Sequence, residues 1–156
     1  MHIYRSSNIP QIIRLEIFQL SISQIDFAVR LSGGNVPTEG RVEVYHRKEW
    51  GTISHNGWGI NSAHVVCRSL GYGVATEAKS GAFFGPGSGT VWLDNVWCYG
   101  VESDLEKCNG GGNGWGGGIP LESQDRWYSI TENIDQNHFS DASVICSESG
   151  NYILRM

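Results

Sequence analysis

The stretch WGINSAHVVCRSLGYG, residues 58–73, decides the fold of this chain. Within it, four small or apolar side chains fall at positions i, i+3, i+4 and i+7, namely Ala63, Val66, Cys67 and Leu70. That spacing places them along one stripe of a helix, so the stretch predicts an amphipathic helix that points Cys67 into the core. A buried cysteine on such a stripe can be a small hydrophobe, so its position does not by itself prove a disulfide.

The ends of the predicted helix carry their own signals. We expect Asn61 or Ser62 to cap the N-terminus by accepting a hydrogen bond from an unpaired backbone N–H. We expect Gly71 to take the left-handed conformation just past the C-terminus, where glycine is favoured.

Short apolar runs separated by turn residues predict β-strands on both sides of the helix. From Val29 onward these runs are VRL, RVEVYH, RKEW and GTI. In the second run Val42 and Val44 alternate with Glu43 and Tyr45, which sends the valines to one face and leaves the other face partly wet. Two later runs, TVWLDNVWC and DASVIC, offer further core candidates: Val91, Leu93, Val96, Ala142, Val144 and Cys146.

Length and charge narrow the class of protein. The chain has 156 residues, enough for one compact domain and little more. Its 11 Lys+Arg against 16 Asp+Glu give a formal charge of -5, so no global basic field exists to neutralise phosphates and nucleic acid is not an expected partner. An aromatic content of 11% is too high for a disordered chain.

The two ends of the chain are expected to lie outside this domain. Residues 1–28 lack the uninterrupted apolar run of a signal peptide or a membrane span, so no signal peptide is visible. An unstructured lead-in is favoured there over a short amphipathic helix carrying Ile12, Leu15 and Phe18. The domain itself is expected over residues 29–147, followed by a tail over residues 148–156.

The chain has four cysteines: Cys67, Cys98, Cys108 and Cys146. An even count in a glycine-rich domain favours two disulfides, although spacing alone leaves three connectivities open. Zinc is disfavoured because the nearest cysteines are 10 positions apart and no histidine falls at ligand spacing. Two disulfides would indicate maturation in an oxidising compartment.

Six blocks, taken in order, closely resemble the scavenger receptor cysteine-rich (SRCR) domain. They are VRLSGG, EGRVEVYHRKEWGTI, WGINSAHVVCRSLGYG, FGPGSGTVWLDNVWCYGVESDLEKC, NGWG and HFSDASVIC. The resemblance implies an α+β fold in which a curved antiparallel β-sheet cradles the helix, an extracellular setting and no catalysis. It also implies a pairing that spacing could not supply, Cys67 with Cys146 and Cys98 with Cys108.

The chain departs from the family pattern at two cysteine positions. Ser54 and Gln136 stand where the family carries cysteines that pair with each other. One usual disulfide is therefore expected to be missing, with no odd thiol left over. Losing a native disulfide from a small secreted domain typically costs about 2–5 kcal/mol of stability.

A second departure concerns calcium, which several members of the family bind. The positions of their two aspartates and one glutamate are held here by His55, Asn56 and Ser140. Calcium prefers six to eight hard, anionic oxygens, so the main site is expected to be lost and no cofactor is predicted. Asp94 is the candidate for a residual site, although a solvated acidic surface is the favoured interpretation of this residue.

A third departure is an extra loop at about residues 117–137, roughly fifteen residues longer than the family pattern needs. Trp127, Tyr128 and Ile130 within it are candidates for a contact surface.

The favoured function is a non-catalytic extracellular recognition module of a scavenger-receptor-like or secreted mosaic protein. A polyanionic or microbial surface ligand would bind Arg41, Arg47 and Lys48, beside His46, although such residues also guard an edge strand against aggregation. A protein partner docking on exposed Trp or Tyr is an equal candidate. Membrane association is expected only through other parts of a parent chain.

Two alternatives stay open, an accessory module of an extracellular protease or amine oxidase and a degenerate spacer. Catalysis within the chain has little support. Ser54 beside His55 is better explained as a replaced cysteine, and His138 and Asp141 belong to the family's structural block.

Overall fold

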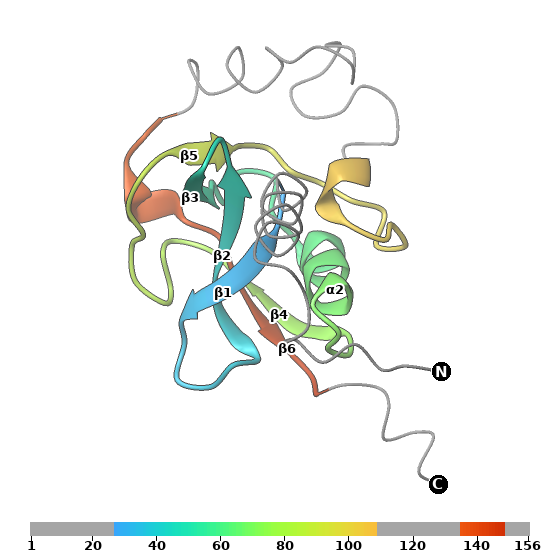
Figure 1. Ribbon diagram of the computed structural model, residues 1–156. Helices are drawn as coiled ribbons and strands as arrows, with labels where there is room; N and C mark the ends of the chain where they lie inside the picture. Colours follow the sequence, from blue (N-terminus) through green and yellow to red (C-terminus); the bar gives the residue numbers. More distant parts are fainter. Residues whose placement is uncertain (1–26, 109–134, 149–156) are drawn as a thin grey trace, which may run out of the picture.

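The computed structural model describes residues 27–108 and 135–148, which form a curled six-stranded sheet against one α-helix (Figure 1). The predicted lead-in up to residue 26, most of the extra loop and the tail beyond residue 148 lie outside the described residues. The elements are β1 (Val29–Gly33), β2 (Glu39–His46), β3 (Glu49–Ile53), α2 (Ile60–Ser69), β4 (Ala75–Lys79), β5 (Val91–Leu93), the 3-10 turns η2 (Leu105–Lys107) and η3 (His138–Ser140), and β6 (Ser143–Cys146).

Strand β2 organises the sheet because both of its edges are used. Its first edge pairs with β1 from Gly40, opposite Gly33, to Val44, opposite Val29. Its second edge is shared, with β6 along the first half and β3 along the second. The remaining strands extend this edge in the order β4-β6-β2-β3-β5.

One strand pair departs from the antiparallel sheet that the resemblance implies. Strands β3 and β5 run parallel. Parallel neighbours need a long crossover connection, and here the crossover contains α2 and β4. The crossover lays the helix across the sheet, where Figure 1 shows α2 beside β4 and β6.

The expected alternation along β2 is present, but the face opposite the core is less exposed to solvent than expected. Val42 and Val44 are 0% and 1% exposed and join the core. Glu43, on the opposite face, is also buried. Its carboxylate is paired with both Arg30 and Arg41, which removes the need for water at that position.

Helix α2 buries the predicted stripe, with Ala63, Val66 and Cys67 fully enclosed. The capping prediction was wrong. The helix begins after Gly59, which has extended backbone and makes no side-chain cap, and the Ser62 hydroxyl instead donates to the Val96 carbonyl at 3.3 Å. At the other end Gly71 has φ 84°, in the left-handed region as expected.

Two disulfides fasten these elements, with the pairing that the resemblance implies. Cys67 of α2 is bonded to Cys146 of β6, and Cys98 is bonded to Cys108. No cysteine of the chain is left free. Within the described residues no helix has the length and apolar character needed to cross a membrane.

Candidate binding surfaces

The segment that follows β5 forms a closed ring, residues 98–108, which we call the disulfide loop. Its Cys98–Cys108 bond joins positions 10 apart in the sequence. Glu102 stands inside the ring and accepts hydrogen bonds from the backbone N–H groups of Tyr99, Gly100 and Val101 at 2.9, 2.9 and 3.0 Å. The ring is therefore closed by the disulfide at its two ends and stabilised by the Glu102 hydrogen bonds between them.

The Glu102 carboxyl has a lowered pKa. Partial burial acts to raise the pKa, but hydrogen bonds from the N–H groups of Tyr99, Gly100, Val101 and Glu102 itself lower it by more, so the pKa lies below the ordinary 4.5. Glu102 is therefore an anion at neutral pH, and its charge is already used by the loop's own backbone.

The disulfide loop is also tied to the helix. Arg68, in the last turn of α2, donates to the Glu102 carbonyl at 2.9 Å. At Gly100, where φ is 106°, an added Cβ would lie 3.1 Å from Asn61 Oδ1. The left-handed backbone favours glycine at this position, and any larger residue would also push the Asn61 side chain aside.

Large apolar side chains are exposed on the disulfide loop and on the residue directly before it. Trp97, Tyr99 and Val101 are 41%, 63% and 84% exposed. The rings of Trp97 and Tyr99 meet edge to face with centroids 5.4 Å apart. We call these three residues the loop face, and none of them was singled out from the sequence.

The basic residues proposed as ligand contacts do not form one patch. Arg41 lies in the middle of β2 with its side chain 12% exposed, bonded to Glu43 and, at 2.9 Å, to the Gly85 carbonyl. Arg47 and Lys48 lie at the turn between β2 and β3, six or more residues further along, or about 20 Å at the rise of an extended strand. His46 is buried.

We call Arg47 and Lys48 the hairpin tip. Both are exposed, and both have positive φ, 48° and 64°. A two-residue hairpin of this kind favours Asn-Gly because side chains with a Cβ are strained in the left-handed region. Two cationic side chains thus stand at positions where the backbone favours Asn and Gly.

The positions of the family's main calcium site are close together but do not fit the ion. The His55 N–H donates to the Ser140 carbonyl at 2.5 Å, and His55 Nδ1 accepts from the Gly81 N–H at 2.9 Å. None of the three side chains, those of His55, Asn56 and Ser140, is a carboxylate, the ligand that calcium prefers. The nearby Asp141 carboxylate is fully buried and is taken by Gly87 and His138.

Asp94, the candidate residual site, accepts a hydrogen bond from the Asn95 N–H at 2.9 Å. In the part of the chain that the structure describes, three potential metal-ligating side chains converge only at Cys98, Glu102 and Cys108. The two sulfurs there are bonded to each other, so neither is a thiolate ligand.

The residues weighed for catalysis have structural partners instead. The Ser54 hydroxyl accepts from the Asn56 N–H, and His55 Nδ1 is occupied by Gly81. His138 bridges buried Asp141, at 3.0 Å, and the Gly89 carbonyl, at 2.9 Å. This pair holds the loop before β5 against the sheet.

The two vacated cysteine positions both contact β5. The Ser54 N–H donates to the Leu93 carbonyl. The Gln136 side-chain amide spans Val91, accepting from its N–H at 2.8 Å and donating to its carbonyl at 3.1 Å. Sequence reasoning found the lost disulfide but not this amide bridge, for which the sequence carries no signal.

A curled sheet that cradles one helix and is fastened by two disulfides is the fold that the resemblance implies. The family model described as "Scavenger receptor cysteine-rich domain" matches residues 32–147, and the chain belongs to this family. The match confirms the resemblance and the fold class.

Among curated proteins the chain is similar to lysyl oxidase homolog 2 of Mus musculus, 39% identical over 83% of this chain and 15% of that protein. It is similar to the macrophage scavenger receptor types I and II of Bos taurus, 48% identical over 51% of this chain and 18% of that protein. It is also similar to galectin-3-binding protein of Bos taurus, 42% identical over 78% of this chain and 19% of that protein. The chain spans less than a fifth of each of these relatives.

Two solved structures share the fold. The third SRCR domain of murine neurotrypsin has a TM-score of 0.59 at 38% identity, covering 77% of this chain and 95% of that one. The dimeric form of the SRCR domain of mouse MARCO has a TM-score of 0.53 at 41% identity, covering 76% of this chain and 94% of that one.

Proposed function

We propose that this domain is a recognition module that docks an extracellular protein through the loop face. The observation that carries the proposal is the exposure of Tyr99 and Val101 on a ring closed by a disulfide, with Trp97 exposed directly before the ring. Exposed aromatic side chains on a rigid support make good binding anchors, because little conformational freedom is lost when they are buried. An accessory role beside a catalytic domain of a parent protein is compatible with such docking.

A selection experiment tests this proposal. The full chain is used as bait for a random peptide library, and selected peptides are titrated against it by fluorescence polarisation. Replacing Tyr99→Ser and Val101→Ser together removes exposed anchors without touching the core, so affinity should fall at least about tenfold, equivalent to about 1.4 kcal/mol. The control, Arg47→Ser with Lys48→Ser, should leave peptide binding unchanged. Equal affinity for wild type and loop variant would refute the proposal.

A second candidate function, binding of a polyanionic surface ligand, is favoured by the strained hairpin tip. Backbone strain kept at an exposed position is a reason to suspect a functional constraint. Arg47 and Lys48 are exposed at the tip, whereas the Arg41 side chain is 12% exposed and is held in an ion pair with Glu43. Arg41 therefore remains a predicted contact, and the tip is tested first.

Heparin, a sulfated polysaccharide, is a suitable probe for this second function. Binding by the tip should survive a chelator. It should be lost when Arg47→Glu and Lys48→Glu are combined, since the two substitutions reverse two charges and change the net charge by four units. Binding that needs calcium would instead point to a surviving cation site near Asp94. No binding in either buffer would remove the polyanion candidate.

A further inference from the structure

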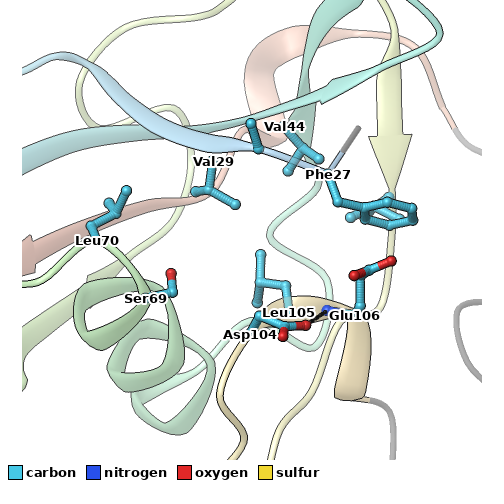
Figure 2. Close-up of a pocket in the computed structure, with 10 residues that line it drawn as sticks. Phe27, Val29, Val44, Ser69, Leu70, Asp104, Leu105 and Glu106 are labelled. Carbon is cyan, nitrogen blue, oxygen red and sulfur yellow. Dashed lines mark hydrogen bonds between the residues drawn. The ribbon is translucent and has the colours of Figure 1, made fainter. Parts of the chain in front are cut away.

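A pocket opens between the start of β1, the C-terminal end of α2 and the turn η2 (Figure 2). Figure 2 shows Val29 and Phe27 on one side and Leu105 on the facing side, with Leu70 at one end. The floor reaches the hydrophobic core, since Val44 there is 1% exposed. We call this pocket the socket.

The size of the socket limits what can enter it. It encloses about 240 Å³, below the roughly 300–1,000 Å³ of sites for small-molecule ligands. A single long side chain is the kind of group that fits. The apolar walls, which include Val29, Leu70 and Leu105, favour an aliphatic stem.

The charge of the socket limits the occupant further. Asp104 and Glu106 both line it, and among its described lining residues there is no Lys, Arg or His. Figure 2 shows the Glu106 carboxylate below the ring of Phe27. Asp104 is fixed in place by accepting from the Glu106 N–H at 3.0 Å. An anion would be repelled here, and a purely apolar plug would remove water from the carboxylates without replacing it.

Asp104 already has a cationic neighbour at the rim. Lys107 Nζ lies 3.6 Å from Asp104 Oδ2, on a side chain that is 66% exposed. An exposed pair at this distance contributes little stability, so a ligand can displace it.

We propose that the socket binds an aliphatic chain ending in a cation, the chemistry of a Lys or Arg side chain on a protein partner. The inference rests on the proposed docking function and deepens it, because Leu105 and both carboxylates belong to the disulfide loop that also carries Tyr99 and Val101. The stem lies against the apolar walls while the charged head meets Asp104 and Glu106, as long basic side chains do when they bury only their methylene groups. A partner would therefore combine an apolar centre with a basic flank.

The experiment is an NMR titration of the ¹⁵N-labelled full chain with three small probes. n-Pentylammonium carries both chain and charge, 1-pentanol carries the chain alone, and methylammonium carries the charge alone. We expect n-pentylammonium to shift the amides of Leu70, Leu105 and Glu106 with a dissociation constant in the millimolar range, as suits so few atoms. The other two probes should bind several-fold more weakly.

Charge-removing variants test the role of the carboxylates. Asp104→Asn keeps a capping side chain for η2, and Glu106→Gln is nearly isosteric. The double variant should bind n-pentylammonium about three- to fivefold more weakly and 1-pentanol unchanged, the effect expected of a solvent-accessible ion pair. Asp94→Asn, the same change of charge outside the socket, should have no effect.

Several outcomes would overturn the proposal. Equal binding of n-pentylammonium and 1-pentanol would show an apolar pocket without charge selection, and no shifts at all would show that no such chain enters. NOEs from residues before Phe27 to Leu70 or Leu105 would show that the chain fills its own socket. Amide shifts that follow protein concentration alone would assign the socket to a second copy. In each case peptide binding sensitive to Tyr99 and Val101 would leave the proposed function standing.

Discussion

A single carboxylate organises the disulfide loop. Glu102 accepts hydrogen bonds from three successive backbone N–H groups, those of Tyr99, Gly100 and Val101. The interaction fixes the backbone from which Tyr99 and Val101 project. The order of the loop face is thus coupled to the ionisation of one residue beneath it.

This coupling predicts a pH dependence. Because the folded-state pKa of Glu102 lies below its unfolded value, the stabilisation is complete above the unfolded pKa and is lost as pH falls through the folded pKa. We expect amide exchange at Tyr99, Gly100 and Val101 to quicken, after correction for its intrinsic pH dependence, as the pH is lowered from about 5.

The matched control is Glu102→Gln, which keeps the shape of the side chain and removes its charge. Protection of these amides should be weaker in this variant at pH 7 and should no longer change with acidification in this range. An unchanged acid dependence in the variant would assign the effect to another group.

The bridge from Gln136 to Val91 is the second feature at this scale, and it bears on the missing disulfide. Ser54→Cys with Gln136→Cys should form the bond that the family pattern contains and should raise the free energy of unfolding by about 2–5 kcal/mol. Mass spectrometry of the unreduced protein would detect the bond and thermal unfolding would measure the gain. Gln136→Ala alone should cost about 1 kcal/mol through two lost hydrogen bonds. A double variant that stays reduced would show that the two positions no longer face each other.

The predicted ligand contacts show where sequence reasoning ends at the level of residues. The sequence places Arg41 near Arg47 and Lys48, and the alternation along β2 puts Arg41 on the same face as Glu43. The contact of Arg41 with the Gly85 carbonyl, 44 positions away, depends on how the loop packs against the sheet. Tertiary pairing of this kind has no local sequence signal. By contrast, Gly71 was predictable because its left-handed backbone follows from its place after a helix.

Among the elements, the β2–β3 hairpin has two non-glycine residues, Arg47 and Lys48, in the left-handed backbone region. Replacing Arg47→Asn and Lys48→Gly supplies the residues that two positive φ angles favour. The variant should gain about 1 kcal/mol in denaturant unfolding, because left-handed backbone costs roughly 1–2 kcal/mol per ordinary residue. It should bind heparin more weakly if the tip is the polyanion site. A variant no more stable than wild type would show that the turn is not strained.

The two disulfides should contribute unequally. Cys67–Cys146 closes a separation of 79 positions and Cys98–Cys108 one of 10, for which chain-entropy estimates are about 4.5 and about 3 kcal/mol. The Cys67→Ala, Cys146→Ala variant should therefore lose more melting temperature than the Cys98→Ala, Cys108→Ala variant. The second variant should lose the order of the loop face instead. Equal losses of melting temperature would contradict this division.

The start of helix α2 shows why element boundaries are harder to predict than elements. Its buried stripe follows from spacing alone and was predicted correctly. The helix begins after Gly59 without a side-chain cap, and Ser62, one of the two predicted caps, donates instead to the Val96 carbonyl, 34 positions away. No local capping rule contains such a contact.

For the molecule as a whole, the ordered blocks and the cysteines were sufficient to predict the family, the fold class and one missing disulfide. The parallel pairing of β3 with β5 was not predicted, since it depends on where the crossover returns the chain. Both candidate binding features on the disulfide loop also escaped prediction. The loop face is defined by which side chains stay exposed, and the socket is a cavity between elements. Both depend on how the sheet, α2 and η2 pack together.

The bond between Cys67 and Cys146 also has a mechanical meaning. A stretching force applied between the two ends of the described domain reaches Cys146, the last residue of β6, and is transmitted through the disulfide to Cys67 of α2. Only the stretch 27–67, about 40 residues or roughly 140 Å of contour at full extension, can then unravel under load. The rest of the domain, with the disulfide loop and η2 in it, lies inside a covalent ring and bears no tension. The ring closed by Cys98–Cys108 would therefore stay intact under load, while β1, β2, β3 and the first part of α2, which pack beside it, unravel.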